Sequence, residues 1–147
     1  MPMDLGISGR RALVAASSLG LGRETARALY EAGCELVVSG RDEDRLAEAI
    51  ADIGGGTAVV ADLTSIEAAE ALVGAATEAM DGVDILVTNN GGPPPGDFAS
   101  TDVSAYQTAL DLNLLSMVGL CKAAVPQMQA RGWGRVVAIT SISVRQP

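Results

Sequence analysis

Two glycines, two residues apart, occur where an apolar segment near the start of the chain meets a helical segment. The junction reads Ala16-Ser17-Ser18-Leu19-Gly20-Leu21-Gly22 and follows the apolar run 11–16. Glycines let the backbone turn tightly, and the N–H groups at the start of a helix, helped by its dipole, bind phosphate. The hydroxyls of Ser17 and Ser18 can donate further hydrogen bonds. The segment therefore indicates a loop that binds a pyrophosphate, although a purely structural turn can use the same glycines.

An arginine follows the second apolar segment, whose end reads Ser39-Gly40-Arg41-Asp42. Folds that bind dinucleotides often carry an acidic residue here, which binds the ribose 2′-hydroxyl. Gly40 occupies that position instead, and the Arg41 guanidinium can pair with a 2′-phosphate. The pattern therefore favours NADP(H) over NAD(H). Two other roles remain open, because Arg41 can pair with nearby acids and Asp42 can cap the next helix.

The composition excludes several other kinds of chemistry. The chain has no His, which removes Ser-His-Asp and Cys-His catalysis and His-ligated metals. The net charge is 10 − 18 = −8, and an acidic surface repels nucleic acid. Cys34 and Cys121 lack the spacing of a metal site and are interpreted as buried packing residues rather than a disulfide or a nucleophile. We expect no metal site, no nucleic-acid partner and a reducing, cytoplasmic setting.

Strand-like and helical segments alternate along the whole chain. The predicted strands are 11–16, 35–39, 57–61, 84–89 and 135–140, and the predicted helices are 21–32, 43–53, 64/65–80 and 104–130. Short, continuously apolar strands between helices are typical of a parallel sheet covered on both faces. We therefore predict a doubly wound α/β fold of the Rossmann type, with strand order 3-2-1-4-5, as a single domain over residues 1–147.

Local signals predict how the third and fourth helices are built. Thr64 or Ser65 can cap the third helix, and Glu67 lies three residues after Thr64, as in a capping box. Pro126 predicts a kink in the long fourth helix, or a division of it into two.

No membrane-targeting segment is predicted. Residues 1–11 lack an apolar run, so no signal peptide is expected there. The most apolar stretch, 110–126, contains Asp111, Asn113 and Lys122, which argues against a membrane span.

Five motifs, in this order, resemble those of the short-chain dehydrogenase/reductase family over essentially the whole chain. They are Gly20-Leu21-Gly22, Asp62-Leu63, Asn89-Asn90-Gly91-Gly92, Asn113 and Ser141. The resemblance is to the N-terminal portion of such proteins, 3-oxoacyl-[acyl-carrier-protein] reductases among them. It implies an NADP(H)-dependent oxidoreductase that interconverts a ketone and a secondary alcohol, with a 3-oxoacyl thioester as one candidate substrate. A homo-oligomer formed through the helix 104–130 is implied as well.

The resemblance also gives roles to individual residues. The acid Asp62 and its neighbour Leu63 would contact the adenine ring, and Asn90 with Gly91 would lie beside the cofactor. The catalytic residues would be Asn113, which supports a water of the proton relay, and Ser141, which binds the substrate oxygen. Each has a structural alternative. Asn113 can brace a helix kink, Ser141 can cap a helix or turn, and Asp62 can cap the helix that follows it.

Three departures from the family pattern bear on function. Ala16 stands where the family has its first glycine, and Pro93-Pro94-Pro95 predicts either a stiff wall near the substrate or a rigid surface loop. The family's tyrosine and lysine are absent, because the chain stops six residues after Ser141 and neither tyrosine is followed by Lys four positions on. We therefore expect a fold truncated after the fifth strand, inactive by itself.

Two other functions remain open. A relative that binds a nucleotide without catalysis would explain the departures at Ala16 and in the proline segment. An S-adenosylmethionine-dependent methyltransferase would share the sheet, but Gly40 removes the acid expected to bind its ribose.

Overall fold

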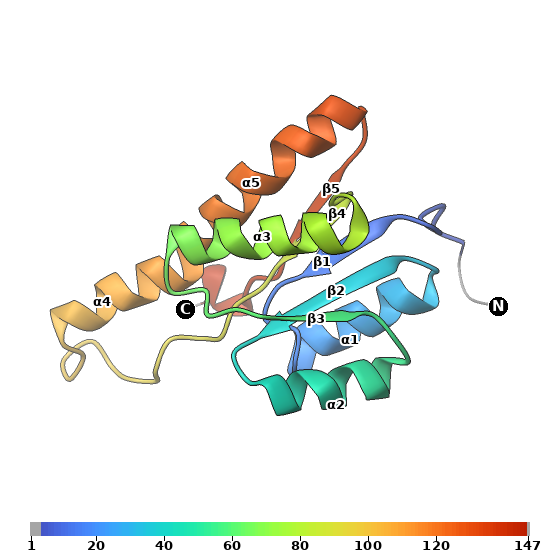
Figure 1. Ribbon diagram of the computed structural model, residues 1–147. Coiled ribbons are helices and arrows are strands. Elements are labelled where there is room, and N and C mark those ends of the chain that lie inside the picture. The colour runs from blue at the N-terminus through green and yellow to red at the C-terminus, as the bar shows by residue number, and fades with distance from the viewer. Residues whose placement is uncertain (1–3, 147) are drawn as a thin grey trace.

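The five apolar segments form one parallel sheet, in the order β3-β2-β1-β4-β5 (Figure 1). The computed structural model describes residues 4–146. Its strands are β1 (Arg11–Val14), β2 (Glu35–Gly40), β3 (Thr57–Val60), β4 (Ile85–Thr88) and β5 (Arg135–Ala138). The predicted fold class and strand order are confirmed. The ends of the predicted domain, residues 1–3 and 147, lie outside the described residues, as does part of the segment in which no signal peptide was expected.

Helices cover both faces of the sheet. They are α1 (Gly20–Glu31), α2 (Glu43–Ile53), α3 (Ile66–Met80), α4 (Val103–Leu110), a π-helical turn (Asp111–Leu115), α5 (Ser116–Arg131) and a short 3-10 helix (Ile142–Val144). Figure 1 shows α1 and α2 on one face and α3 and α5 on the other. Because all neighbouring strands pair in parallel, every strand ends at the same edge of the sheet, where the connections to the helices begin.

Two small-residue cores, one on each face of the sheet, hold these layers together. Along β1, Ala12 and Val14 pack toward α1 and α2, whereas Leu13 packs toward α3 and α5. All three side chains are fully buried. Because aromatic residues make up only 3% of the chain, Ala, Val, Leu and Ile fill both cores and let the helices lie close to the sheet.

Several local predictions need correction. β1 ends at Val14 rather than Ala16, because the backbone of Ala16 turns to a φ of 47°. Ser65 caps α3 by accepting a hydrogen bond from the N–H of Ala68. The capping box of Thr64 with Glu67 is therefore wrong, because Glu67 is one position too early in the helix for it.

The long helix is continuous from Val103 to Arg131. Pro126 lies inside α5 and does not divide it, and the irregular turn falls at Asp111–Leu115 instead. By length and composition alone this helix could cross a membrane, and only 22% of its most apolar window is buried. Core helices of soluble proteins meet the same criteria.

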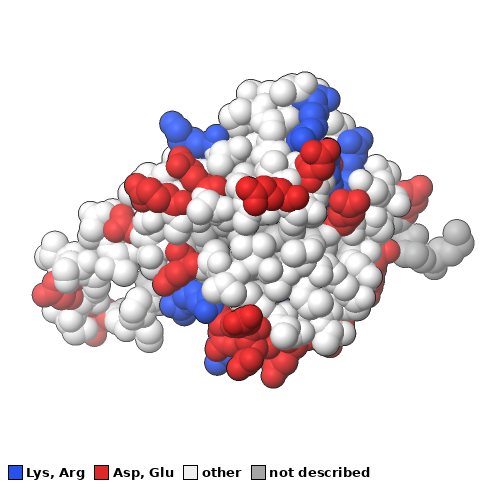
Figure 2. Space-filling view, in the orientation of Figure 1, with Lys and Arg blue, Asp and Glu red and all other residues white. Residues whose placement is uncertain are grey.

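Acidic side chains gather over α2 and α3 on the face shown in Figure 2, where large areas carry no charge at all. The net charge of −8 is therefore unevenly distributed over the surface.

Candidate active site

The turn between β1 and α1 presents backbone N–H groups that no side chain caps. Leu19 precedes α1 and makes no side-chain hydrogen bond to it, whereas Asp42, Ser65 and Asp102 cap α2, α3 and α4. The first N–H groups of any helix lack partners within the helix. Among the described residues, this leaves the first turn of α1, at Gly20, with donors directed at the carboxyl edge of the sheet, which is suited to an anion.

Gly22 is required by close packing at this turn. A Cβ atom there would lie 2.6 Å from the carbonyl oxygen of Ala16 and 2.7 Å from Nδ2 of Asn89. The Asn89 amide already donates a hydrogen bond of 2.9 Å to that carbonyl oxygen. The start of α1, the turn and the end of β4 are thus fastened together with no room for a side chain at position 22.

Ala16 turns the backbone at the end of β1 in spite of its Cβ atom. Its φ of 47° lies in the left-handed region, which costs a residue with a Cβ roughly 1–2 kcal/mol. The Ala16 N–H donates to Oγ of Ser39 at 3.1 Å, and its carbonyl accepts from Asn89. These contacts hold Ala16 in the strained conformation.

Ser17 braces the loop from inside. Its side chain is fully buried, and its hydroxyl donates to the carbonyl of Val14 at 2.7 Å and accepts from the N–H of Ser39 at 3.1 Å. Its own N–H donates to the Ser39 carbonyl. The expectation that the Ser17 hydroxyl donates toward a phosphate is therefore wrong in this structure, because the hydroxyl serves the link between β1 and β2.

Ser18 lies beside Gly40 at the end of β2, and Arg41 follows that strand. A Cβ atom at Gly40 would lie 3.0 Å from Oγ of Ser18, so the glycine loop and the strand end are in contact. Arg41 is exposed and makes no ion pair with any described residue, which removes the alternative that it pairs with nearby acids. Asp42 caps α2 by accepting a hydrogen bond of 3.0 Å from the N–H of Arg45, which is the helix-capping role predicted for it as an alternative. The guanidinium of Arg41 is thus left available to a ligand.

Asp62 and Leu63 follow β3 on the same side of the sheet. The Ala61 N–H donates to the Gly40 carbonyl at 2.8 Å, which places the end of β3 beside that of β2. The Asp62 side chain is exposed and Leu63 is buried. Since Ser65 caps α3, the alternative role of Asp62 as the cap is wrong, and its carboxylate faces solvent near the Arg41 end of the site.

Asn90 connects the end of β4 to the long helix. Its Nδ2 donates to the Leu112 carbonyl at 2.5 Å and to Oγ of Ser116 at 2.7 Å. The neighbouring Gly91 is exposed, and a Cβ atom there would touch nothing within 4 Å. Ser116 was not predicted as a site residue. Its one signal in the sequence is a polar side chain within an apolar helical segment, where burial is expected.

The two predicted catalytic residues are placed by different elements. Asn113 lies within the π-helical turn, half-buried, and its Nδ2 donates to the Ala109 carbonyl at 3.0 Å, as expected for an amide that braces an irregular helix. Ser141 is exposed beyond β5, and its Oγ accepts from the N–H of Ser143 at 3.2 Å as the cap of the 3-10 helix. Among the described residues no hydrogen bond joins Asn113 to Ser141. Their catalytic roles stay predictions.

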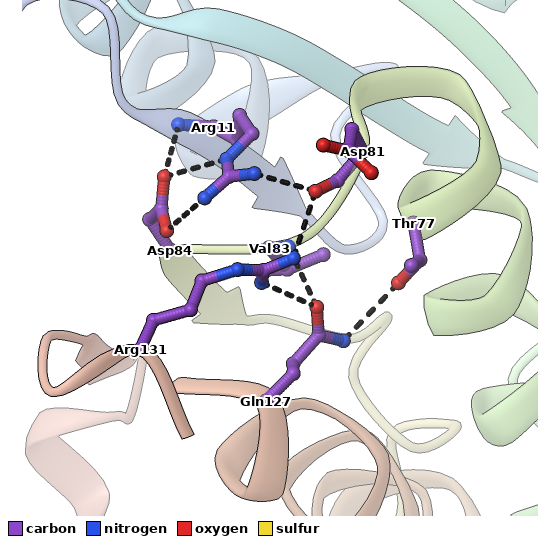
Figure 3. Close-up of polar contacts among 7 residues, drawn as sticks. All are labelled: Arg11, Thr77, Asp81, Val83, Asp84, Gln127 and Arg131. Carbon is purple, nitrogen blue, oxygen red and sulfur yellow. Dashed lines mark hydrogen bonds and ion pairs between the residues drawn. The ribbon is translucent and has the colours of Figure 1, made fainter. Parts of the chain in front are cut away.

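The opposite edge of the sheet carries a separate polar cluster, drawn in Figure 3. Arg11, at the start of β1, holds the buried Asp84 through bonds of 2.8 Å and 2.7 Å. The Arg11 guanidinium lowers the pKa of the Asp84 carboxyl below its ordinary value. Arg131 and Gln127 extend the cluster from α5 to the end of α3. It lies at the start of the strands, so it serves the fold and not the candidate site.

Cys34 is a buried packing residue, as predicted, whereas Cys121 is only partly buried against the core. Both thiols are free, and burial raises the pKa of Cys34 and of Cys121, which keeps them protonated at neutral pH. Within residues 4–146 no three His, Cys, Asp or Glu side chains come together in a way that could hold a metal ion.

Comparison with known proteins agrees with this geometry. A family model described as short chain dehydrogenase matches residues 10–147. The curated dehydrogenase/reductase SDR family member 4 of Homo sapiens is 34% identical over 146 residues, which cover 96% of this chain and 52% of the relative. The corresponding protein of Rattus norvegicus is 33% identical over 93% of this chain and 51% of its own length. The chain spans about half the length of the curated relatives it matches.

Solved structures show the same arrangement of elements. L-sorbose reductase from Gluconobacter frateurii, complexed with NADPH and L-sorbose, superimposes with a TM-score of 0.92 at 32% identity, covering 99% of this chain and 57% of the other. A putative betaketoacyl-ACP reductase gives a TM-score of 0.86 at 36% identity, over 95% and 57% of the two chains.

Proposed function

This chain belongs to the short-chain dehydrogenase family, and from that premise we propose that the complete protein is an NADP(H)-dependent oxidoreductase that interconverts a ketone and a secondary alcohol. The observation that carries the proposal is the uncapped start of α1 behind a turn that excludes any side chain at Gly22. Backbone N–H groups there suit the diphosphate of a dinucleotide.

The residues at the end of β2 support NADP(H) as the cofactor. Arg41 is exposed, lacks an ion pair among residues 4–146 and follows a glycine rather than an acid. A guanidinium next to the ribose can pair with the 2′-phosphate through two parallel hydrogen bonds. The relative from Gluconobacter frateurii that superimposes so closely is a complex with NADPH.

The chain's own residues divide the work at the site. The nicotinamide, when bound, supplies or accepts the hydride. Asn89 and Ser17 keep the glycine loop in the shape that receives a diphosphate, and Asp62 and Leu63 flank the adenosine end. Ser141 would hold the carbonyl oxygen through its hydroxyl, and Asn113 would hold a water for proton delivery. A 3-oxoacyl thioester is one substrate to test, since a putative betaketoacyl-ACP reductase is among the similar structures.

The long helix supports a further part of the proposal, that the protein is a homo-oligomer. Its exposed apolar side chains are Val103, Tyr106, Leu110, Leu114 and Val118. An apolar face of this kind is typical of an interface between subunits. Two free, protonated thiols support a reducing cytoplasmic location. No observation on the described residues favours a nucleotide-binding relative without catalysis, or a methyltransferase.

The test uses protein expressed from the complete reading frame. NADPH oxidation is followed with a panel of 3-oxoacyl thioesters, simple ketones and ketoses, and repeated with NADH. We expect turnover with at least one carbonyl compound and a higher kcat/KM for NADPH. Failure of every substrate with both cofactors would contradict the proposal.

A further inference from the structure

The long helix changes its hydrogen-bond pattern at the point where Asn90 contacts it. In an α-helix the N–H of Ser116 would donate to the carbonyl of Leu112, four residues earlier. Here the Ser116 N–H donates to the carbonyl of Asp111, five residues earlier, which makes Asp111–Leu115 a π-helical turn. The Leu112 carbonyl therefore loses the amide that would ordinarily satisfy it.

Two side chains replace that amide. Nδ2 of Asn90 and Oγ of Ser116 each donate to the Leu112 carbonyl oxygen at 2.5 Å. Nδ2 of Asn90 also lies 2.7 Å from Oγ of Ser116, within reach of a second hydrogen bond. The Ser116 hydroxyl donates to the Leu112 carbonyl and accepts from the Asn90 amide. The three groups form a closed set around one carbonyl, with Ser116 fully buried.

This closed set joins the candidate cofactor site to Asn113. Asn89 holds the Ala16 carbonyl of the glycine loop, and the next residue, Asn90, holds the Leu112 carbonyl, one residue before Asn113. A π-helical turn carries one residue more than an α-helical turn. It therefore rotates the side chains before it by about 100° relative to those after it. The direction in which Asn113 points depends on whether the turn persists.

We propose that Ser116 is a positioning residue that, together with Asn90, holds the helix in its π-helical turn and so fixes the orientation of Asn113 at the active site. The inference rests on the proposed function, because it takes Asn113 to order a water for proton delivery. A serine that bonds to its own helix four residues back can also simply bend the helix. The experiment must therefore measure more than stability.

The test compares Ser116→Ala with Ser104→Ala in protein from the complete reading frame. Both changes delete one hydroxyl from the same long helix, but Ser104 bonds to the exposed Asp102 and lies before the π-helical turn. Alanine is smaller than serine and a good helix former, so Ser116→Ala introduces no clash. Ser116→Cys replaces the hydroxyl with a larger and much weaker donor, and serves as the second variant if the alanine variant does not purify.

We expect Ser116→Ala to lower kcat about tenfold, since a positioned group in proton transfer contributes on the order of 10²–10⁴-fold and its misplacement forfeits part of this. The dissociation constant of NADPH should stay within about twofold of the wild-type value, because the glycine loop is unchanged. In a crystal structure of the variant, the backbone N–H of residue 116 should donate to the carbonyl of Leu112, and the Asn113 side chain should point in a different direction. Ser104→Ala should change none of these.

Three results would overturn the inference. They are an unchanged kcat in Ser116→Ala, a loss equal to that of Ser104→Ala, and a variant structure that retains the π-helical turn with Asn113 unmoved. If the wild-type protein turns over no carbonyl compound, the proposed function fails. The variant structure then still decides whether Ser116 holds the turn.

Discussion

Among single residues, Gly22 tolerates substitution least, because two polar atoms occupy the space that a side chain at this position would need. We expect Gly22→Ala to weaken NADPH binding at least about tenfold, since a near-contact in the loop displaces the N–H groups that bind the diphosphate. Isothermal titration of the protein from the complete reading frame measures this. Gly74→Ala is the matched control, because a Cβ atom at Gly74, within α3, touches nothing within 4 Å. Equal affinities for NADPH in the two variants would contradict the close packing at Gly22.

Arg41 is expected to determine the preference for NADPH over NADH. Loss of its guanidinium should lower affinity for NADPH about 10- to 100-fold and leave NADH nearly unaffected, because only NADPH carries the 2′-phosphate. Arg45→Ala removes the same charge from α2, where the side chain is also exposed, and should change neither affinity much. The prediction is wrong if Arg41→Ala weakens both cofactors to the same extent.

The sequence predicted where the site residues lie along the backbone, but not the directions in which their side chains point. The spacing of the glycines and the strand-end position of Arg41 depend on the backbone, which the alternation of apolar segments predicts. The hydroxyl of Ser17 turned inward because the buried junction of β1 and β2 needs a donor there. No spacing pattern distinguishes that orientation from one toward a ligand.

At the scale of elements, the contact between Arg11 and Asp84 fastens the starts of β1 and β4. Removing Arg11 leaves a buried carboxylate without its partner, so Arg11→Ala should cost about 2–3 kcal/mol in the free energy of unfolding. Arg27→Ala breaks exposed ion pairs with Glu24 and Asp52 and should cost under about 1 kcal/mol. Urea unfolding at neutral pH compares the two. Equal losses of unfolding free energy in the two variants would show that the burial of Asp84 adds nothing to the stability of the fold.

The same contact predicts a dependence on pH. Arg11 lowers the pKa of Asp84 in the folded state. The stabilisation of the fold by this contact is therefore complete above the unfolded carboxyl pKa of about 3.9. It is lost as the pH falls through the lower pKa of the folded state. The gap in unfolding free energy between the wild type and Arg11→Ala should therefore narrow in acid. A gap that stays constant from neutral pH to about pH 3 would contradict the assignment.

The sequence predicted the five strands and the long helices to within a few residues, but neither the short 3-10 helix Ile142–Val144 nor the irregular turn in the long helix. Pro126 suggested a break, yet α5 continues through it. At the π-helical turn Asp111–Leu115, the Leu112 carbonyl instead accepts from Asn90, which lies in the loop after β4. Such a tertiary hydrogen bond leaves no periodic trace in the helix itself, so pattern reasoning could not find it.

At the scale of the whole molecule, acidic residues gather over α2 and α3, while α4 and α5 keep apolar side chains in solvent. If the long helix forms the subunit interface, Leu114→Glu should shift the protein toward monomer, because a charge there is desolvated on association. Light scattering coupled to size exclusion measures the mass. Ala47→Glu, on the exposed side of α2, is the control. An unchanged mass for Leu114→Glu would place any interface elsewhere.

We propose that the carboxyl edge of this sheet binds NADPH at the turn between β1 and α1. A crystal structure of the protein from the complete reading frame, grown with NADPH, tests this most directly. We expect the diphosphate against the N–H groups of Gly20, Leu21 and Gly22, and the 2′-phosphate against Arg41. A nucleotide bound elsewhere, or a turn that stays closed by protein groups at saturating NADPH, would contradict it.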